Sequence, residues 1–301
     1  MKAFRAIVMA VVILLLCGCS APATTAPTTE DPYPYDYTDP SFFAIDNCLT
    51  YAPKVKLTGV NGGAPFDIKS TKDGFTVAQG AASDGTYGYF LQAKTNANIG
   101  GVFKEACKII KVDMRSWEIV MESEPLEVCH GNGMGYNSKT GKLVIAHNKP
   151  EHQNISIVDP ETLQVERVVT IDRAIQSIAY NAQRDQYVVR MSGNWNFAIL
   201  DADFNEVSYH ETGVRTPLSS QCMTCDDQYI YMLDSGVTKM PGFECITVYN
   251  WEGKYLGVYR VPSVQETEAI VICGGDYYIT FFNGSGTRVY KLEMDYSLLG
   301  K

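Results

Sequence analysis

Five repeats of four short strands predict that residues 41–301 form an all-β domain, a β-propeller of five four-stranded blades. The repeats begin near residues 79, 132, 176, 221 and 268, so successive starts lie 44 to 53 residues apart. Within each repeat, polar and apolar residues alternate as they do in half-buried strands. Clusters of Gly, Asn and Asp predict the turns between these strands, and no long helical pattern interrupts them.

Residues 1–18 are typical of a cleavable lipoprotein signal peptide. Lys2 and Arg5 precede an apolar run from Ala6 to Leu16, which is shorter than the about 20 residues that a membrane-spanning helix needs. The residues Leu16-Cys17-Gly18-Cys19 resemble the bacterial lipobox, in which the cysteine receives diacylglycerol. The resemblance implies a lipid anchor at Cys19 and an extracytoplasmic location on a bacterial cell membrane. An ordinary signal peptide with a coincidental cysteine is the alternative.

Residues 19–40 are expected to form a disordered tether behind the lipidated cysteine. Ala, Pro, Thr, Tyr and acidic residues dominate this segment, which has no apolar pattern that could build a core. The net charge of the chain is −9, and it becomes about −11 once Lys2 and Arg5 leave with the signal peptide. An acidic chain without a basic run disfavours nucleic acid as a partner and favours neutral or cationic ligands.

The second repeat shows the order of strands most clearly. Strands starting at Asn132 and at Lys142 are followed by strands over 153–159 and 163–171. The phrase Val158-Asp159-Pro160-Glu161-Thr162-Leu163 resembles the turns of YVTN/NHL-like propellers of secreted bacterial proteins, a resemblance of architecture that implies no ligand. The first repeat is longer than the others, and its additional residues are assigned to a loop over 95–105.

The last repeat provides only three strands before Asp295. The strand over 55–58, upstream of the first repeat, is therefore expected to complete the last blade. This pairing closes the ring, because an open ring leaves two sheet edges exposed. Six blades, with a complete additional blade within 43–75, and an open two-sheet sandwich are the alternatives.

One position of each repeat is polar although the core of the blade does not require it. It lies two residues before the first apolar residue of the first strand, and the first strand of a propeller blade lines the central channel. We therefore expect ligand-binding side chains near one mouth of the channel. This polar ring consists of Gln79, Asn132, Gln176, Gln221 and Glu268. Its amides both donate and accept hydrogen bonds, so they suit a small neutral or zwitterionic ligand, unless they serve only to satisfy one another and bound water.

His130, Ser219 and Glu266 are expected at the rim of the same mouth and belong to the predicted ligand site. Glu266 and Glu268 lie on one face of a strand, roughly 6–7 Å apart by strand rise. With His130, this acid pair supports an alternative in which the chain is a hydrolase or lyase that acts on a glycan. A structural scaffold in an envelope assembly is the second alternative.

Other residues with possible chemistry give weaker predictions. His147 and His152 flank a loop, but no third ligand is evident in the sequence, so neither a metal nor another cofactor is expected. Cys222 and Cys225 form a CxxC within a strand, which favours structural cysteines. Trp195, in a predicted loop, could stack on a sugar or pack between blades. The favoured function is a membrane-anchored propeller that binds a small molecule, glycan, peptide or protein at its channel mouth.

Overall fold

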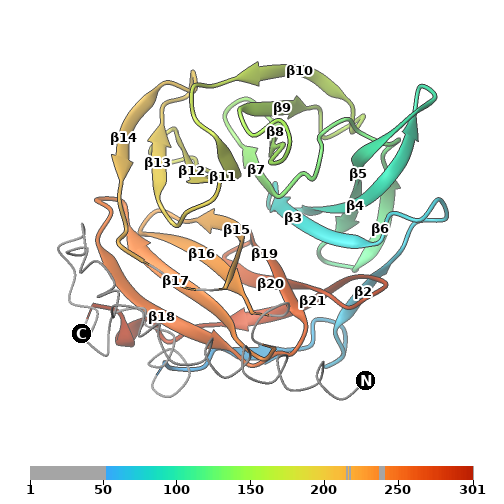
Figure 1. The fold of residues 1–301 in the computed structure, drawn as a ribbon. Coiled ribbons are helices and arrows are strands. Elements are labelled where there is room, and N and C mark those ends of the chain that lie inside the picture. The colour runs from blue at the N-terminus through green and yellow to red at the C-terminus, as the bar shows by residue number, and fades with distance from the viewer. Residues whose placement is uncertain (1–51, 215, 217, 237–240, 301) are drawn as a thin grey trace, which may run out of the picture. The chain divides into compact units, whose positions relative to one another are not determined.

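The computed structural model describes residues 52–214, 216, 218–236 and 241–300. These residues form five β-sheets arranged as the blades of a β-propeller around a central axis, as the repeats predict (Figure 1). The predicted signal peptide, Cys19 and the tether lie outside the described residues. Within the described ranges, no helix is long and apolar enough to cross a bilayer.

Four blades each contain four antiparallel strands that follow one another in the sequence. The first two blades consist of β3 (Val77–Ser83), β4 (Tyr87–Ile99), β5 (Val102–Asp113) and β6 (Glu118–Glu122), then of β7 (Gly133–Asn137), β8 (Lys142–Ala146), β9 (Asn154–Val158) and β10 (Val165–Thr170). The next two consist of β11 (Ile175–Asn181), β12 (Gln186–Met191), β13 (Phe197–Leu200) and β14 (Glu206–His210), then of β15 (Ser219–Cys225), β16 (Tyr229–Ser235), β17 (Glu244–Asn250) and β18 (Tyr255–Val261). The first strands β3, β7, β11 and β15 lie innermost (Figure 1).

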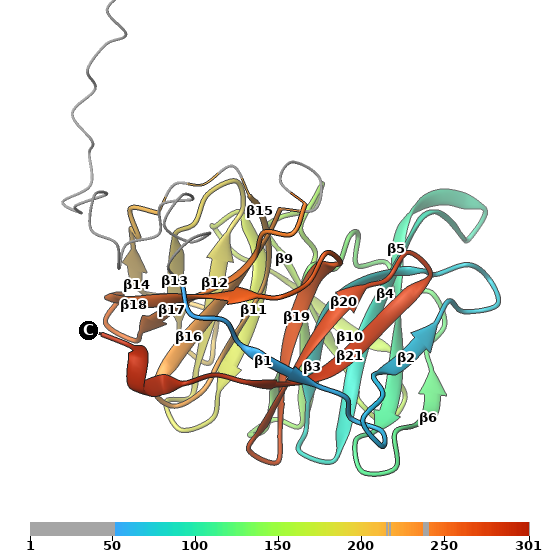
Figure 2. The ribbon, with the colours of Figure 1, turned by 90° about the horizontal axis from the view of Figure 1, so that it is seen from below.

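The fifth blade joins the beginning and the end of the described chain. Its strands β19 (Glu266–Cys273), β20 (Asp276–Phe282) and β21 (Gly286–Glu293) come from the last repeat. Both β1 (Lys56–Thr58) and β2 (Phe66–Lys69) pair antiparallel with β21, and Figure 2 shows them beside it. The prediction that the strand over 55–58 closes the ring is confirmed. β2 was not predicted, and the six-bladed alternative is wrong because residues 52–75 add only these two strands to the fifth sheet.

Polar side chains hold the turn after the innermost strand of most blades. Oδ1 of Asp84 accepts hydrogen bonds from the backbone N–H groups of Thr86 and Tyr87, at 2.8 and 2.7 Å. Asn137, Asn181 and Asp226 make the same kind of contact in the next three blades. This repeated Asx turn explains why Asn and Asp recur between the predicted strands.

The apolar core lies between neighbouring blades rather than at the axis. Four clusters of buried side chains combine residues mainly from two adjacent blades, and a fifth joins the first and fifth blades and also includes Cys222 of the fourth. Every innermost strand contributes its predicted apolar residue to a different cluster, and these residues are Ala81, Met134, Ile178, Met223 and Ile270. These apolar residues therefore do not fill the propeller axis, and the axis is the position at which the polar ring was predicted.

The additional residues of the first repeat form strands and not the predicted loop. β4 and β5 stay paired as far as Ile99 and Val102, and Gly100 and Gly101 make the turn with φ values of 58° and 83°. The polar sequence over 95–105 lacks a clear alternation, but cross-strand pairing satisfies its backbone all the same. In Figure 2 this hairpin extends beyond the face at which the innermost strands begin.

Candidate functional site

A β-bulge lies at the polar-ring position in four of the five innermost strands. The strand register shifts there by one or more residues, and each shift spans one member of the ring: Gln79, Gln176, Gln221 or Glu268. The fifth member, Asn132, immediately precedes β7. Bulges redirect side chains and are common beside active sites. The simple alternation assumed from the sequence is therefore interrupted at this step, and all five side chains are buried.

The innermost strands approach one another very closely beside this ring. A Cβ atom on Gly133 would lie 2.6 Å from the Cα atom of Ser177, and one on Gly80 would lie 2.8 Å from the backbone of Gly133. Oγ of Ser177 accepts a hydrogen bond of 2.9 Å from the backbone N–H of Met223. Small residues thus fix the spacing of the strands that carry the ring.

A pocket of about 470 Å³ opens at the end of the channel where the innermost strands begin. We call it the mouth pocket. It brings together five of the eight predicted ligand-binding residues and one predicted aromatic residue: His130, Asn132, Gln176, Ser219, Gln221 and Trp195. Gln79, Glu266 and Glu268 do not line it. Side chains from three successive blades therefore converge on one concave surface.

Hydrogen bonds link polar-ring residues to the neighbouring blade. The side chain of Gln176 exchanges two hydrogen bonds of 2.5 Å with Ser220, and Nε2 of Gln221 donates to Oε1 of Glu266 at 2.7 Å. Oε1 of Gln79 is buried and accepts no hydrogen bond from the described part of the chain. Asn132 likewise makes no side-chain hydrogen bond within the described residues, so its amide can serve a bound molecule.

Burial raises the pKa of three carboxyl groups in the fourth and fifth blades. Burial raises the pKa of Glu266, and the hydrogen bond from Gln221 and the nearby His130 oppose this shift. Burial, reinforced by Glu266 and Glu244, raises the pKa of Glu268 well above its usual value. Burial also raises the pKa of Glu244 to about 7, despite hydrogen bonds from Thr267. The surroundings of Glu268 thus favour its neutral form, in which the carboxyl group can donate a hydrogen bond.

A buried ion pair supports the floor of the mouth pocket. The side chains of Arg190 and Asp234 are both fully buried, and Nη2 of Arg190 lies 2.5 Å from Oδ1 of Asp234. Arg190 also donates to the backbone carbonyl of Gln221 at 3.1 Å, and Asp234 accepts a hydrogen bond of 2.8 Å from Nε1 of Trp195. The pair thus fixes both an amide residue and the aromatic residue of the pocket, and Trp195 itself remains partly exposed.

The long hairpin of the first blade is tied to the opposite wall of the pocket. Nδ1 of His130 lies 2.5 Å from Oε1 of Glu105, near the base of the hairpin. Lys104, the preceding residue, pairs with Glu127. The imidazole of His130 is therefore held in place from outside the pocket, an interaction that the sequence alone does not reveal.

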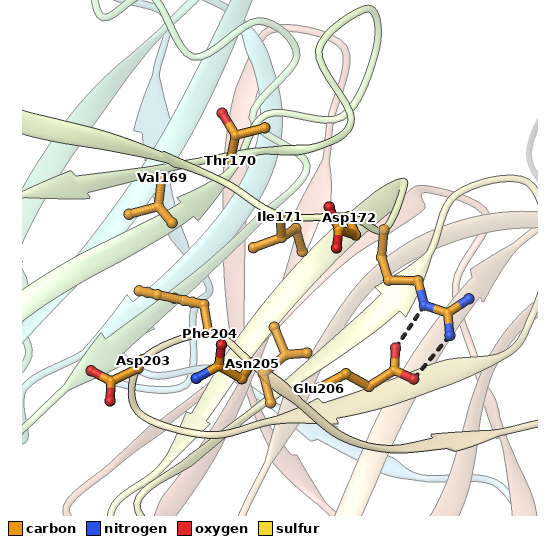
Figure 3. Close-up of a pocket in the computed structure, with 10 residues that line it drawn as sticks. Val169, Thr170, Ile171, Asp172, Asp203, Phe204, Asn205 and Glu206 are labelled. Atoms are coloured by element: carbon orange, nitrogen blue, oxygen red, sulfur yellow. Dashed lines mark hydrogen bonds and ion pairs between the residues drawn. The ribbon is translucent and has the colours of Figure 1, made fainter.

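A second cavity, of about 590 Å³, lies away from the axis between the second and third blades. Figure 3 shows Ile171 and Asp172 on one side of it, with Phe204, Asn205 and Glu206 on the other. Arg173 and Glu206 form a two-bonded ion pair there, at 2.6 and 2.9 Å. None of the predicted site residues lines this cavity, and its one arginine, Arg173, is already paired with Glu206.

A group of potential metal ligands lies beside the mouth pocket in the second blade. One ligand atom each of Cys129, His147 and Glu151 falls within 4.8 Å of the other two. The sequence pointed to His147 but not to Cys129, which lies 18 residues earlier and approaches only through the fold. His152, the other predicted histidine, instead contacts Oγ of Ser192 at 3.0 Å.

Neither Cys222 nor Cys225 forms a disulfide. Cys222 and Cys225 lie in β15, are buried, and belong to different core clusters, in agreement with structural roles on opposite faces of the strand. Burial raises the pKa of both thiols. The CxxC therefore contributes packing rather than a reactive thiolate.

Comparison with known proteins establishes the fold and no function. No protein-family model matches the sequence, and no curated protein matches it. Glutaminyl cyclase from Myxococcus xanthus is similar in structure, with a TM-score of 0.52 and 14% identity, over 76% of this chain and 94% of that chain. A chain of the nidogen–laminin complex has a TM-score of 0.46 and 14% identity, over 73% and 80%. Similarity at this identity is similarity of the propeller architecture alone.

Proposed function

We propose that this chain is a membrane-anchored extracytoplasmic binding protein whose mouth pocket holds a small polar molecule. The observation that carries the proposal is the convergence of Asn132, Gln176, Gln221 and Trp195 in one pocket. Concave sites with a few converging polar groups are the usual form of small-molecule sites. The amides offer donors and acceptors, and the indole offers a flat apolar surface.

This combination favours a neutral or zwitterionic ligand with hydrogen-bonding groups on one side and an apolar face on the other. A sugar unit, either free or within a glycan, has this character. Asn132 is available to it because its amide is not engaged by the protein, whereas the hydrogen bonds of Gln176 to Ser220 fix the position of that side chain. Gln79 and Glu268 are buried and lie outside the lining of the mouth pocket, and Oε1 of Gln79 has no hydrogen-bond partner among the described residues.

The test is a binding screen with the full chain against mixed sugars and amino acids, read by ligand-detected NMR and followed by calorimetry. Asn132→Ala and Trp195→Ala are expected to weaken binding of a hit by about tenfold each, since a hydrogen bond or an aromatic contact contributes on the order of 1–1.5 kcal/mol. Asp203→Asn, in the outer cavity of Figure 3, is the matched control and should bind normally. Unchanged affinity in both pocket variants would exclude the mouth pocket as the site.

A hydrolase or lyase that uses Glu266 and Glu268 on a glycan is the second candidate. The raised pKa of Glu266, beside the pocket wall, is the observation in its favour, because a general acid must hold its proton near neutral pH. Glu268 is only 3% exposed and does not line the pocket, which argues against a direct part in catalysis for that residue. The double change Glu266→Gln and Glu268→Gln separates the two candidates: an enzyme loses turnover outright, whereas a binding protein retains part of its affinity.

Anchoring is tested separately through the lipobox. In cells labelled with palmitate, the wild-type chain should incorporate label and fractionate with the membrane, and Cys19→Ser should abolish both. Cys17→Ser is the control, because serine is a small residue that the lipobox tolerates. Equal labelling of the Cys19→Ser chain would contradict the anchor. A chain in which neither binding nor activity responds to any pocket change would instead support a scaffold role.

A further inference from the structure

The loops at the entrance of the second blade gather three side chains of metal-binding type. Cys129 lies in the segment between β6 and β7, His147 directly follows β8, and Glu151 lies in the loop between β8 and β9. Thiolate, imidazole and carboxylate are the ligands that zinc and similar transition metals use, whereas calcium and magnesium take oxygen ligands.

The distances within this group are close to those that a tetrahedral ion requires. Nδ1 of His147 lies 3.2 Å from Oε2 of Glu151, and the ligand atoms of all three residues lie within 4.8 Å of one another. Ligand atoms around tetrahedral zinc are separated by about 3.3–3.6 Å, so a shift of about 1 Å completes the site. Glu151 is exposed and can make this shift, while His147 is held rigidly.

Outer contacts orient two of the ligands, as they do in established metal sites. Nε2 of His147 lies 2.8 Å from Oγ of Ser156, which can accept its proton and leave Nδ1 free for a metal. Nδ2 of Asn154 donates to Oε2 of Glu151 at 2.9 Å. Cys129 has a φ of 52°, a left-handed backbone that a non-glycine residue rarely adopts. The surrounding structure therefore enforces the conformation that brings its sulfur to His147.

A nucleophilic triad is the competing interpretation of the same contacts, and the burial of its members argues against it. Ser156, His147 and Glu151 follow one another in hydrogen-bonded order, as in a serine hydrolase. However, Ser156 is 0% exposed within β9, so no substrate reaches its hydroxyl.

We propose that Cys129, His147 and Glu151 bind a zinc-type divalent transition metal, with a fourth position left to water or to a ligand. Binding replaces the thiol proton of Cys129, which is released to solvent. The site is separate from the amides that carry the proposed function, but it adjoins them, because His130, Asn148 and Lys149 line the mouth pocket. Lys104 lies near enough to act on Cys129 and Glu151 electrostatically, and its pairing with Glu127 moderates that repulsion of a cation.

The test is titration of the chelator-treated full chain with Co²⁺, followed by displacement with Zn²⁺. We expect one equivalent of Co²⁺ to produce a thiolate-to-cobalt charge-transfer band that Zn²⁺ removes and Ca²⁺ does not. Cys129→Ser should abolish the band. Glu151→Gln should lower the affinity by about 10–100-fold or more, since even outer contacts of metal sites are worth that much. Cys273→Ser and His152→Asn are the matched controls and should leave band and affinity unchanged.

Folding of each variant is checked by thermal unfolding. If Cys129→Ser fails to fold, Glu151→Gln decides, because 53% of the Glu151 side chain is exposed and its change should not disturb the core. The proposal is overturned if the wild-type chain gives no charge-transfer band, if Ca²⁺ competes as well as Zn²⁺, or if Glu151→Gln binds Co²⁺ as tightly as the wild type. A band that depends on Cys273 would equally overturn it.

Discussion

Removal of the Asp234 carboxylate tests whether the buried ion pair holds the mouth pocket together. In Asp234→Ala, Arg190 keeps its charge at 0% exposure and loses its only carboxylate partner among the described residues. Leaving one charge of a buried pair uncompensated costs about 3–5 kcal/mol. For a domain of this size, that loss corresponds to a fall of about 6–20 °C in the melting temperature.

The measurement is thermal unfolding by circular dichroism, with urea unfolding to give the free energy. Glu206→Ala is the matched control, because it breaks an ion pair between Arg173 and Glu206 whose side chains are 43% and 34% exposed. Such a pair is worth about 1 kcal/mol or less. Trp195 also loses the acceptor of its Nε1–H in Asp234→Ala, so its fluorescence should report a wetter, more mobile indole.

The double variant Arg190→Met with Asp234→Leu completes the cycle. It removes both charges and should be more stable than Asp234→Ala, although the carbonyls of Gln221 and Leu233 lose a donor. The reasoning is refuted if Asp234→Ala stays within about 1 kcal/mol of the wild type. It is also refuted if the double variant is no more stable than the single one.

Three further perturbations address the acids, the inner strands and the closure of the ring. Because the pKa of Glu244 is raised to about 7 in the fold, the folded chain binds more protons than the unfolded one between pH 4.5 and 7. The contribution of Glu244 to stability should therefore fall as pH rises through this range, by at most about 1.4 kcal/mol per pH unit, and Glu244→Gln should make the profile measured by urea unfolding less steep, with Glu266 and Glu268 responsible for the slope that remains. Gly133→Ala should cost about 1–3 kcal/mol through its clash with Ser177, and more than Gly135→Ala, whose Cβ would find its nearest neighbour at 3.2 Å; equal costs would contradict the close approach. Ile68→Ala in β2 should cost about 2–5 kcal/mol in the same assay, and no loss would mean that β2 adds nothing to the fifth blade.

The propeller architecture could be predicted from the sequence because each repeat satisfies the same local constraints. Asx residues at 84, 137, 181 and 226 close the same hairpin in four blades, so the strand order could be predicted without knowledge of distant contacts. The last repeat has only three strands, so a strand from upstream was likewise predicted to complete its blade. β2 escaped prediction because it is four residues long and its only described partner, β21, lies more than 200 residues away.

The sequence predicted several of the residues that belong to the mouth pocket, but it did not predict how their side chains are arranged. Repeat alignment identified Asn132, Gln176 and Gln221, which the fold brings into one pocket. It did not foresee the bulges, because a bulge depends on the pairing partner and leaves no mark in the alternation of a single strand. Nor could it reveal Asp234 beneath Trp195 or Cys129 beside His147, since these pairs depend on how loops and blades pack in three dimensions.

The double pairing of β1 and β2 with β21 also determines when this protein can fold. Lys56 in β1 pairs with Glu293 in β21, so the last described strand must exist before the first described strand can pair. Contacts between such distant residues form slowly, because the intervening chain must first be ordered. Until then β1 and β2 have no sheet to join, and the fifth blade presents an open edge. Completion of the ring therefore comes after the synthesis of β21, and a chain truncated before β21 would remain open and exposed to aggregation.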